Sequence, residues 1–124
     1  MPAPPLQRLR KICLALPEAV ERPFGKHVTF QIRGKNFVMH LDNHHGDGRL
    51  AVWCKAAPGE QQLLVDLDPE RFFVPPYVGP SGWIGVRLDR RIDWPVLTRL
   101  VTDSYRLIAP KRVAAKLAGG RPRK

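Results

Sequence analysis

Two cations flank a glycine in the stretch Arg33-Gly34-Lys35, which lies between two apolar segments. A tight reversal is served equally well by Asn-Gly or Asp-Gly, so these side chains carry more charge than a turn requires. Cations at a hairpin tip can contact phosphate oxygens, which positions a protein on nucleic acid without reading its base sequence. We therefore predict a phosphate-contacting wing at Arg33 and Lys35, with solubility as the alternative explanation.

A second concentration of charge lies at the C-terminus. Residues 111–124 hold six Lys and Arg and no carboxylate, whereas residues 1–110 hold 15 Lys and Arg against 11 Asp and Glu. Most of the net charge of +10 therefore belongs to this segment, which we interpret as a basic tail. Such a tail attracts polyanions through its field and through counterion release, although it can also serve only to solubilise the chain end. Its predicted contacts are Lys111, Arg112 and Lys116.

Further cations flank the expected strands and turns, and each of them taken alone can equally be a solvated surface residue. The predicted additional nucleic-acid contacts are Arg49, Lys55, Arg90 and Arg91. If they line the same side as the wing, they extend one phosphate-binding surface.

An aromatic loop supplies the competing hypothesis. Residues 72–83, FFVPPYVGPSGW, hold three prolines and cannot form regular structure, so the loop is expected to be stiff. Tyr77 and Trp83 in this loop can line a groove that binds a protein or a small ligand, although aromatic side chains are more often part of a core.

One stretch has the residue types of a metal site. The sequence HLDNHHGDG contains His40, Asp42, His44, His45 and Asp47. Its spacing fits neither a helical histidine pair nor a calcium-binding loop, and the same residue types are common in turns with unusual backbone angles. We predict a turn and no metal ion.

Enzymatic patterns are weaker still. Asp66, Asp68 and Glu70 are acidic neighbours without a base or nucleophile near them in sequence, and no Gly-rich loop opens a helix after a strand. Cys13 and Cys54 form neither a CxxC site nor a disulfide framework, which favours a reducing cytoplasm. We expect a protein that is not an enzyme and has no cofactor.

The elements that must position these residues follow from hydrophobic periodicity. Residues 4–17 have apolar positions at helical spacing, and the segments around Phe30 and Met39 alternate with period two, as a half-buried hairpin does. A third strand is expected at 49–54, antiparallel to the second. A short helix should follow near Leu63, and Asp68 should cap one more helical turn before a strand at 83–88.

The last predicted helix begins at Asp93, which precedes a long amphipathic segment. Helices at both ends of the chain and hairpin-linked strands between them predict an α+β fold, a two-layer sandwich with a mainly antiparallel sheet. We divide the chain into one domain at 1–110 and the basic tail at 111–124. No apolar run approaches the roughly 20 residues of a membrane span, so we expect no membrane association.

The order of these motifs resembles the MmcQ/YjbR family of small bacterial proteins. The resemblance is carried by LRKICLALPEAVERPFG, by GKNF, by LLVDLDPERFFVPPYVGPSGWIGVRLD and by SYRLIAPK, from Leu6 to Lys111. It implies a fold similar to the frataxin-like CyaY architecture, and a DNA-binding role, itself a prediction, attributed to a double-wing arrangement of hairpins. The segment GGRPRK lies outside the resemblance.

Two hypotheses remain. The first is a cytoplasmic module that binds duplex DNA through phosphates, with little sequence selectivity, using the wing and the tail. The second is an adaptor that binds a protein or a small ligand at the loop from Tyr77 to Trp83. We expect a monomer in either case.

Overall fold

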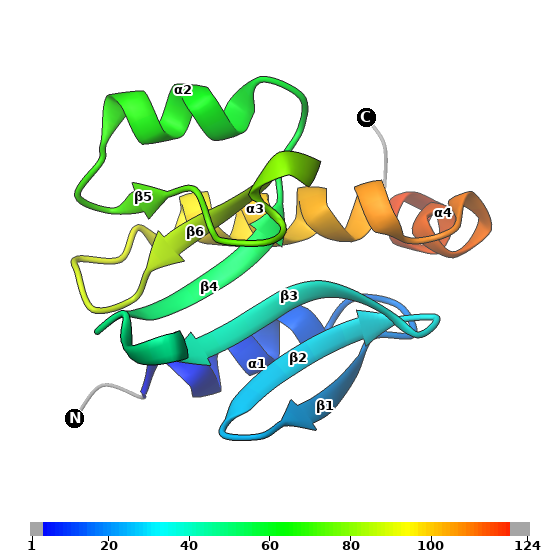
Figure 1. Ribbon diagram of the computed structural model, residues 1–124. Helices are drawn as coiled ribbons and strands as arrows, with labels where there is room; N and C mark the ends of the chain where they lie inside the picture. The colour runs from blue at the N-terminus through cyan, green and yellow to red at the C-terminus, as the bar shows by residue number, and fades with distance from the viewer. Residues whose placement is uncertain (1–3, 120–124) are drawn as a thin grey trace.

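The computed structural model describes residues 4–119 and contains a six-stranded antiparallel sheet with helices α1 and α3 lying behind it (Figure 1). The helices are α1 (Pro5–Leu14), α2 (Glu60–Leu67), α3 (Trp94–Ile108) and α4 (Lys111–Gly119). The strands are β1 (Val20–Phe24), β2 (His27–Ile32), β3 (Lys35–Asp42), β4 (Leu50–Lys55), β5 (Phe72–Phe73) and β6 (Trp83–Arg87). They lie in the order β1-β2-β3-β4-β6-β5. The predicted α+β class with a mainly antiparallel sheet is confirmed.

The β2–β3 hairpin closes through a turn of only two residues. Ile32 pairs with Lys35, and between them Arg33 and Gly34 both have positive φ, at 52° and 80°. Positive φ at both central positions defines the type I′ turn, whose twist matches that of the flanking strands and which favours Asn-Gly. Arg33 therefore occupies a position where a long side chain is unusual.

Helix α3 packs the centre of the sheet from behind. Asp93 accepts a hydrogen bond from the backbone N–H of Val96 at 3.2 Å, so the predicted cap is confirmed. The buried face that α3 turns to the sheet consists of Leu97, Leu100, Val101, Ser104 and Tyr105. The helix ends before Pro110, which lacks the N–H that a continuing helix would need.

Apolar side chains fill both faces of the sheet. The larger cluster lies between the sheet and the helices and includes Phe30, Phe37 and Tyr105. The smaller cluster consists of Leu41, Ala51, Trp53, Phe73 and Trp83. Met39 and Val78 pack against this second cluster, and Val78 belongs to the loop that follows β5. The loop therefore covers part of the face that the helices leave open.

Two strands were missed by the sequence analysis. β1 contains Glu21, Arg22 and Pro23 in succession and has no alternation of apolar and polar residues. Pro23 is tolerated there because β1 is an edge strand, where a missing N–H costs no ladder hydrogen bond on the open side. β5 has two residues, too few to give a period.

The predicted cap at Asp68 is wrong. A backbone turn does form, since the N–H of Phe72 donates to the carbonyl of Asp68 at 3.0 Å. The carboxylate, however, accepts from Arg71 Nε at 2.8 Å, and Phe72 already begins β5. A nearby guanidinium competes with the backbone for this carboxylate.

The segment interpreted as a tail starts with a helix instead. α4 buries Val113 to 1% exposure, and Ala114 and Leu117 pack against the same apolar cluster. These three residues share one helical face, and the cations lie on the other. Residues 120–124 of the predicted tail lie outside the described residues. No helix within 4–119 is long and apolar enough to cross a membrane.

Candidate functional site

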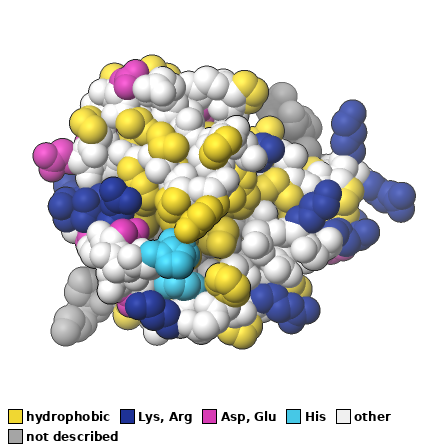
Figure 2. All heavy atoms as spheres, in the orientation of Figure 1, with side chains coloured by type: hydrophobic (Ala, Val, Ile, Leu, Met, Phe, Trp, Pro, Cys, Tyr) yellow, Lys and Arg dark blue, Asp and Glu magenta, His cyan; other side chains and the backbone are white. Residues whose placement is uncertain are grey.

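Five of the predicted cations meet at one end of the molecule. The β2–β3 turn and α4 lie together at the right of Figure 1, and Figure 2 shows Lys and Arg side chains gathered there. We call this group the basic end; it consists of Arg33, Lys35, Lys111, Arg112 and Lys116, all of them exposed. Within residues 4–119, Lys35, Lys111 and Arg112 form no ion pair with any carboxylate. The basic end can therefore attract an external anion.

Glu18 is the carboxylate of this end. It accepts from Arg33 Nε at 2.7 Å and from Lys116 Nζ at 2.5 Å, and so joins the turn before β1, the hairpin tip and α4. The two cations are about half exposed, with 54% of each side chain accessible. The sequence analysis missed this residue because its partners lie 15 and 98 positions away.

The hydrogen bonds from Arg33 and then Lys116 lower the pKa of Glu18 from its ordinary 4.5 to about 2. Since the folded value lies below the unfolded one, this contact stabilises the fold above pH 4.5, and its contribution is lost as the pH falls toward about 2. A carbon-13 NMR titration of the Glu18 carboxyl should therefore give a midpoint near pH 2. In Arg33→Ala the midpoint should move up toward 4.5; an unchanged midpoint would mean that Arg33 does not hold the carboxylate in solution.

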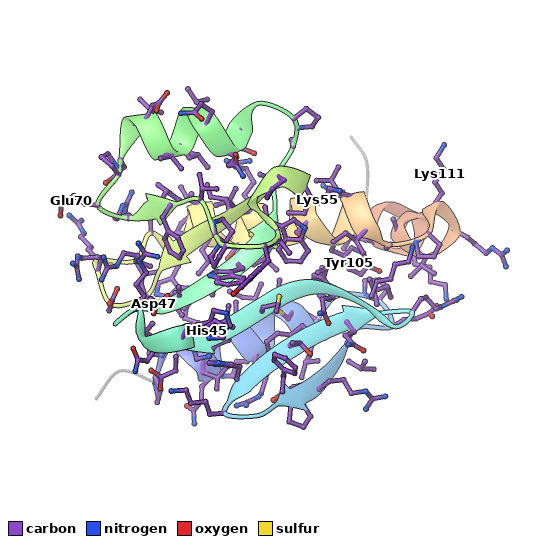
Figure 3. All side chains as sticks on the ribbon, viewed as in Figure 1. His45, Asp47, Lys55, Glu70, Tyr105 and Lys111 are labelled. Carbon is purple, nitrogen blue, oxygen red and sulfur yellow. The ribbon has the colours of Figure 1, made fainter. Side chains whose placement is uncertain are left out.

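The other predicted cations do not join the basic end. Arg49 lies 3.9 Å from Asp47 and stacks on the Phe73 ring at 4.0 Å from its centroid. Figure 3 shows Asp47 and Glu70 at the end of the molecule opposite Lys111. Arg90 and Arg91 line a hollow together with Glu70, so they also lie at that far end. The nine cations therefore form no single surface.

The far hollow has a mixed charge. It has a volume of about 870 Å³ and is lined by Arg8, Asp68, Glu70, Arg71, Arg90, Arg91, Ile92, Asp93, Trp94 and Pro95. Arg71 is already paired with Asp68, and Arg8 lies 4.6 Å from the centroid of the Trp94 ring. Lys55, the ninth predicted cation, is half-buried in a separate hollow beside Leu107. Arg91 and Lys55 also form no ion pair with a carboxylate within residues 4–119, so the basic end differs from them in that its five cations lie together.

The aromatic loop separates its two predicted residues. Trp83 is only 8% exposed and belongs to the second apolar cluster, so it is a core residue and does not line an open groove. Tyr77 is 76% exposed and has a left-handed backbone at φ 69°. Its ring centroid lies 6.1 Å from that of His45 and 6.4 Å from that of His44. Figure 2 shows the histidines amid apolar side chains on this face.

His44 and Trp53 were not predicted as parts of this face. Their ring centroids are 5.1 Å apart, and both His44 Nε2 and Trp53 Nε1 are buried without a hydrogen-bond partner among the described residues. The turn that carries His44 also has left-handed Asn43 and His45, at 54° and 51°. The predicted turn at 42–48 is thus confirmed. Within residues 4–119, no three His, Cys, Asp or Glu side chains are placed to hold a metal ion.

Comparisons with known proteins address the fold. A family model described as YjbR matches residues 14–107, which leaves α4 outside the match. The crystal structure of Deinococcus radiodurans protein DR2400, described as carrying the domain DUF419, matches with a TM-score of 0.72. The identity is 22%, and the match covers 94% of this chain and 88% of that one, so the likeness shows a shared fold. No curated protein matches the chain.

Proposed function

Since the chain belongs to the YjbR family, whose DNA-binding role is itself a prediction, we propose that it is a non-enzymatic module that binds duplex DNA through its phosphates. The observation that carries this proposal is the gathering of five cations, from a hairpin tip and from a helix, at the basic end. Within residues 4–119, Glu18 carries the one carboxylate that forms an ion pair with any of these cations.

The geometry favours phosphates over base edges as the target. The β2–β3 turn has only two residues beyond the strands, and α4 has its cations distributed over an exposed face. Lys and Arg contacts to phosphate release condensed counterions, which gives affinity that falls steeply with salt and depends little on sequence. The expected binding is therefore weakly selective and sensitive to salt.

The two thiols are not available as catalytic nucleophiles. Cys13 and Cys54 are fully buried, and burial raises the pKa of both, that of Cys54 to about 12. A thiol acts as a nucleophile only when it is ionised and reachable. Neither cysteine meets these conditions in the folded protein.

The test compares two adjacent pairs of cations at opposite ends. Lys111→Ala/Arg112→Ala should lower the slope of log affinity against log salt by about 1.8 units, and the affinity at 0.1 M salt about 60-fold, at about 0.9 units per lost phosphate contact. Arg90→Ala/Arg91→Ala removes the same charge from the far end and should change the affinity less than twofold. A labelled random-sequence duplex, titrated across a salt series by fluorescence anisotropy, measures both.

Equal losses in the two pairs would contradict the proposal that the basic end is the binding surface, because net charge alone would then explain them. No binding by the intact chain near 0.15 M salt would overturn DNA binding altogether. Circular dichroism of each variant confirms that the fold is intact before the affinities are compared.

A second candidate function is an adaptor that binds a protein or small ligand beside Tyr77. The observation that favours it is an exposed aromatic ring on a strained backbone, since left-handed residues other than glycine often mark binding sites. Tyr77→Ala is the appropriate probe of this surface, because the buried Trp83 cannot be replaced without disturbing the core. In the DNA titration this variant should behave as the intact chain does.

A further inference from the structure

The ion pairs around Glu18 have the geometry of an occupied anion site. Glu18 Oε1 accepts from Arg33 Nε at 2.7 Å, and Glu18 Oε2 accepts from Lys116 Nζ at 2.5 Å. One carboxylate thus receives charge-assisted hydrogen bonds from two cations on separate elements. The pair remains open to solvent, since about half of each cationic side chain is accessible.

Both members of the Arg33–Glu18 pair have unfavourable backbone conformations. Arg33 is the first residue of the two-residue hairpin turn, at φ 52°, where Asn or Gly is preferred. Glu18 is the third residue of the turn closed by the Ala19 N–H and the Leu16 carbonyl, and its φ is 62°. With Pro17 before it, this is the position of a type II turn that favours glycine. Two such residues meeting in one contact indicate a role for their side chains that outweighs the local strain.

We infer that Arg33 and Lys116 form a phosphate-binding site, and that the Glu18 carboxylate occupies this site in the free protein as a substitute for a phosphate group. The inference rests on the proposed function, because it names the contact that a phosphodiester of the DNA backbone would make there. A phosphate presents two non-bridging oxygens, and these can accept from the same guanidinium and ammonium groups. Binding would require Glu18 to release both donors.

The competing explanation is that Glu18 only fastens α4 to the hairpin. The two explanations predict opposite signs when the carboxylate is removed. A fastening contact would leave binding unchanged or weaken it, because α4 would be less well held. An internal competitor would strengthen binding, because both cations become available.

The test removes the carboxylate and keeps the side-chain shape. Glu18→Gln should raise duplex affinity about eightfold at 0.1 M salt and steepen the salt slope by about 0.9, which is one additional phosphate contact. The matched control is Asp89→Asn, which frees Arg87 from a similar pair with bonds of 2.9 Å to both carboxylate oxygens, but outside the basic end. It changes the net charge equally and should alter the affinity less than twofold.

Two further variants protect the test against a folding artefact. Glu18→Gly removes the carboxylate and suits the positive φ, so it should strengthen binding as Glu18→Gln does. Adding Arg33→Ala to Glu18→Gln should abolish the gain. Unchanged or weaker binding in both Glu18 variants would overturn the inference.

A titration with inorganic phosphate separates this inference from the proposed function. In Glu18→Gln the side-chain Nε–H resonance of Arg33 should shift saturably as phosphate is added, and in Asp89→Asn it should stay fixed. If the shift occurs but no variant binds the duplex, the result supports the phosphate site and contradicts the proposal of DNA binding. If the duplex binds but Glu18→Gln shows neither the shift nor the steeper slope, the result supports DNA binding and contradicts the phosphate site.

Discussion

Replacing Tyr105 by alanine should lower the free energy of unfolding by about 3–5 kcal/mol, the usual cost of removing a large aromatic side chain from a core. Tyr105 is 0% exposed, and its ring packs edge-on against Phe37 with centroids 5.5 Å apart. Its hydroxyl donates to the carbonyl of Pro17 at 2.8 Å, so it joins α3 to the chain just before Glu18. Urea denaturation followed by circular dichroism measures the loss.

Tyr105→Phe is the matched control, because it removes only the hydroxyl. It should cost about 1 kcal/mol, the net value of one hydrogen bond, and leave the ring contacts in place. If the alanine variant cost no more than the phenylalanine variant, the aromatic packing would not be what holds α3 to the sheet.

Gly85→Ala should cost about 2–3 kcal/mol, as overpacking of a core does. A Cβ at position 85 would lie far inside contact distance of the Phe73 ring, closest to its Cζ. The Phe73 ring cannot simply retreat, because it is buried in the second apolar cluster with Leu41, Ala51, Trp53 and Trp83. The midpoint of urea denaturation should fall accordingly.

A double-mutant cycle isolates this contact. Phe73→Leu shortens the side chain that meets the new methyl group, so Gly85→Ala should cost much less in that background than in the intact chain. Simple additivity of the two losses would contradict a direct clash between residues 73 and 85, since coupling is expected only between residues in contact.

Strong periodicity made much of the fold predictable. The alternation around Phe30 and Met39 predicts β2 and β3, and the helical face that contains Leu97 and Tyr105 predicts α3. Asp93 marks the start of that helix through its capping chemistry. In each case the sequence signal is local and repeated along the segment. Contacts with distant residues therefore do not override the structure that it predicts.

Elements without such repetition were not predictable in the same way. β1 pairs with β2 although its sequence has no alternation, and β5 owes its strand geometry entirely to β6. The helicity of α4 was visible in the spacing of Val113 and Leu117, but the excess of cations dominated the interpretation of that segment. Contacts with distant parts of the chain determine the structure of all three elements.

The candidate site depends still more on distant residues. Sequence patterns identify Arg33 and Lys116 as exposed cations, but the contact that joins them runs through Glu18, 98 residues from Lys116. The same patterns could not show that Arg90 and Arg91 lie with Glu70 at the far end. Composition identifies charges, whereas topology decides which of them can act together.

The two buried thiols can report how often the core of the protein opens. Cys13 lies in α1 and Cys54 in β4, on opposite layers of the larger core, and both are inaccessible. An alkylating reagent can reach them only when the helical layer separates from the sheet. The rate of thiol modification therefore reflects how often the two layers separate, and no added label is needed to measure it. A ligand that binds the native state alone would slow that rate, whatever its chemistry.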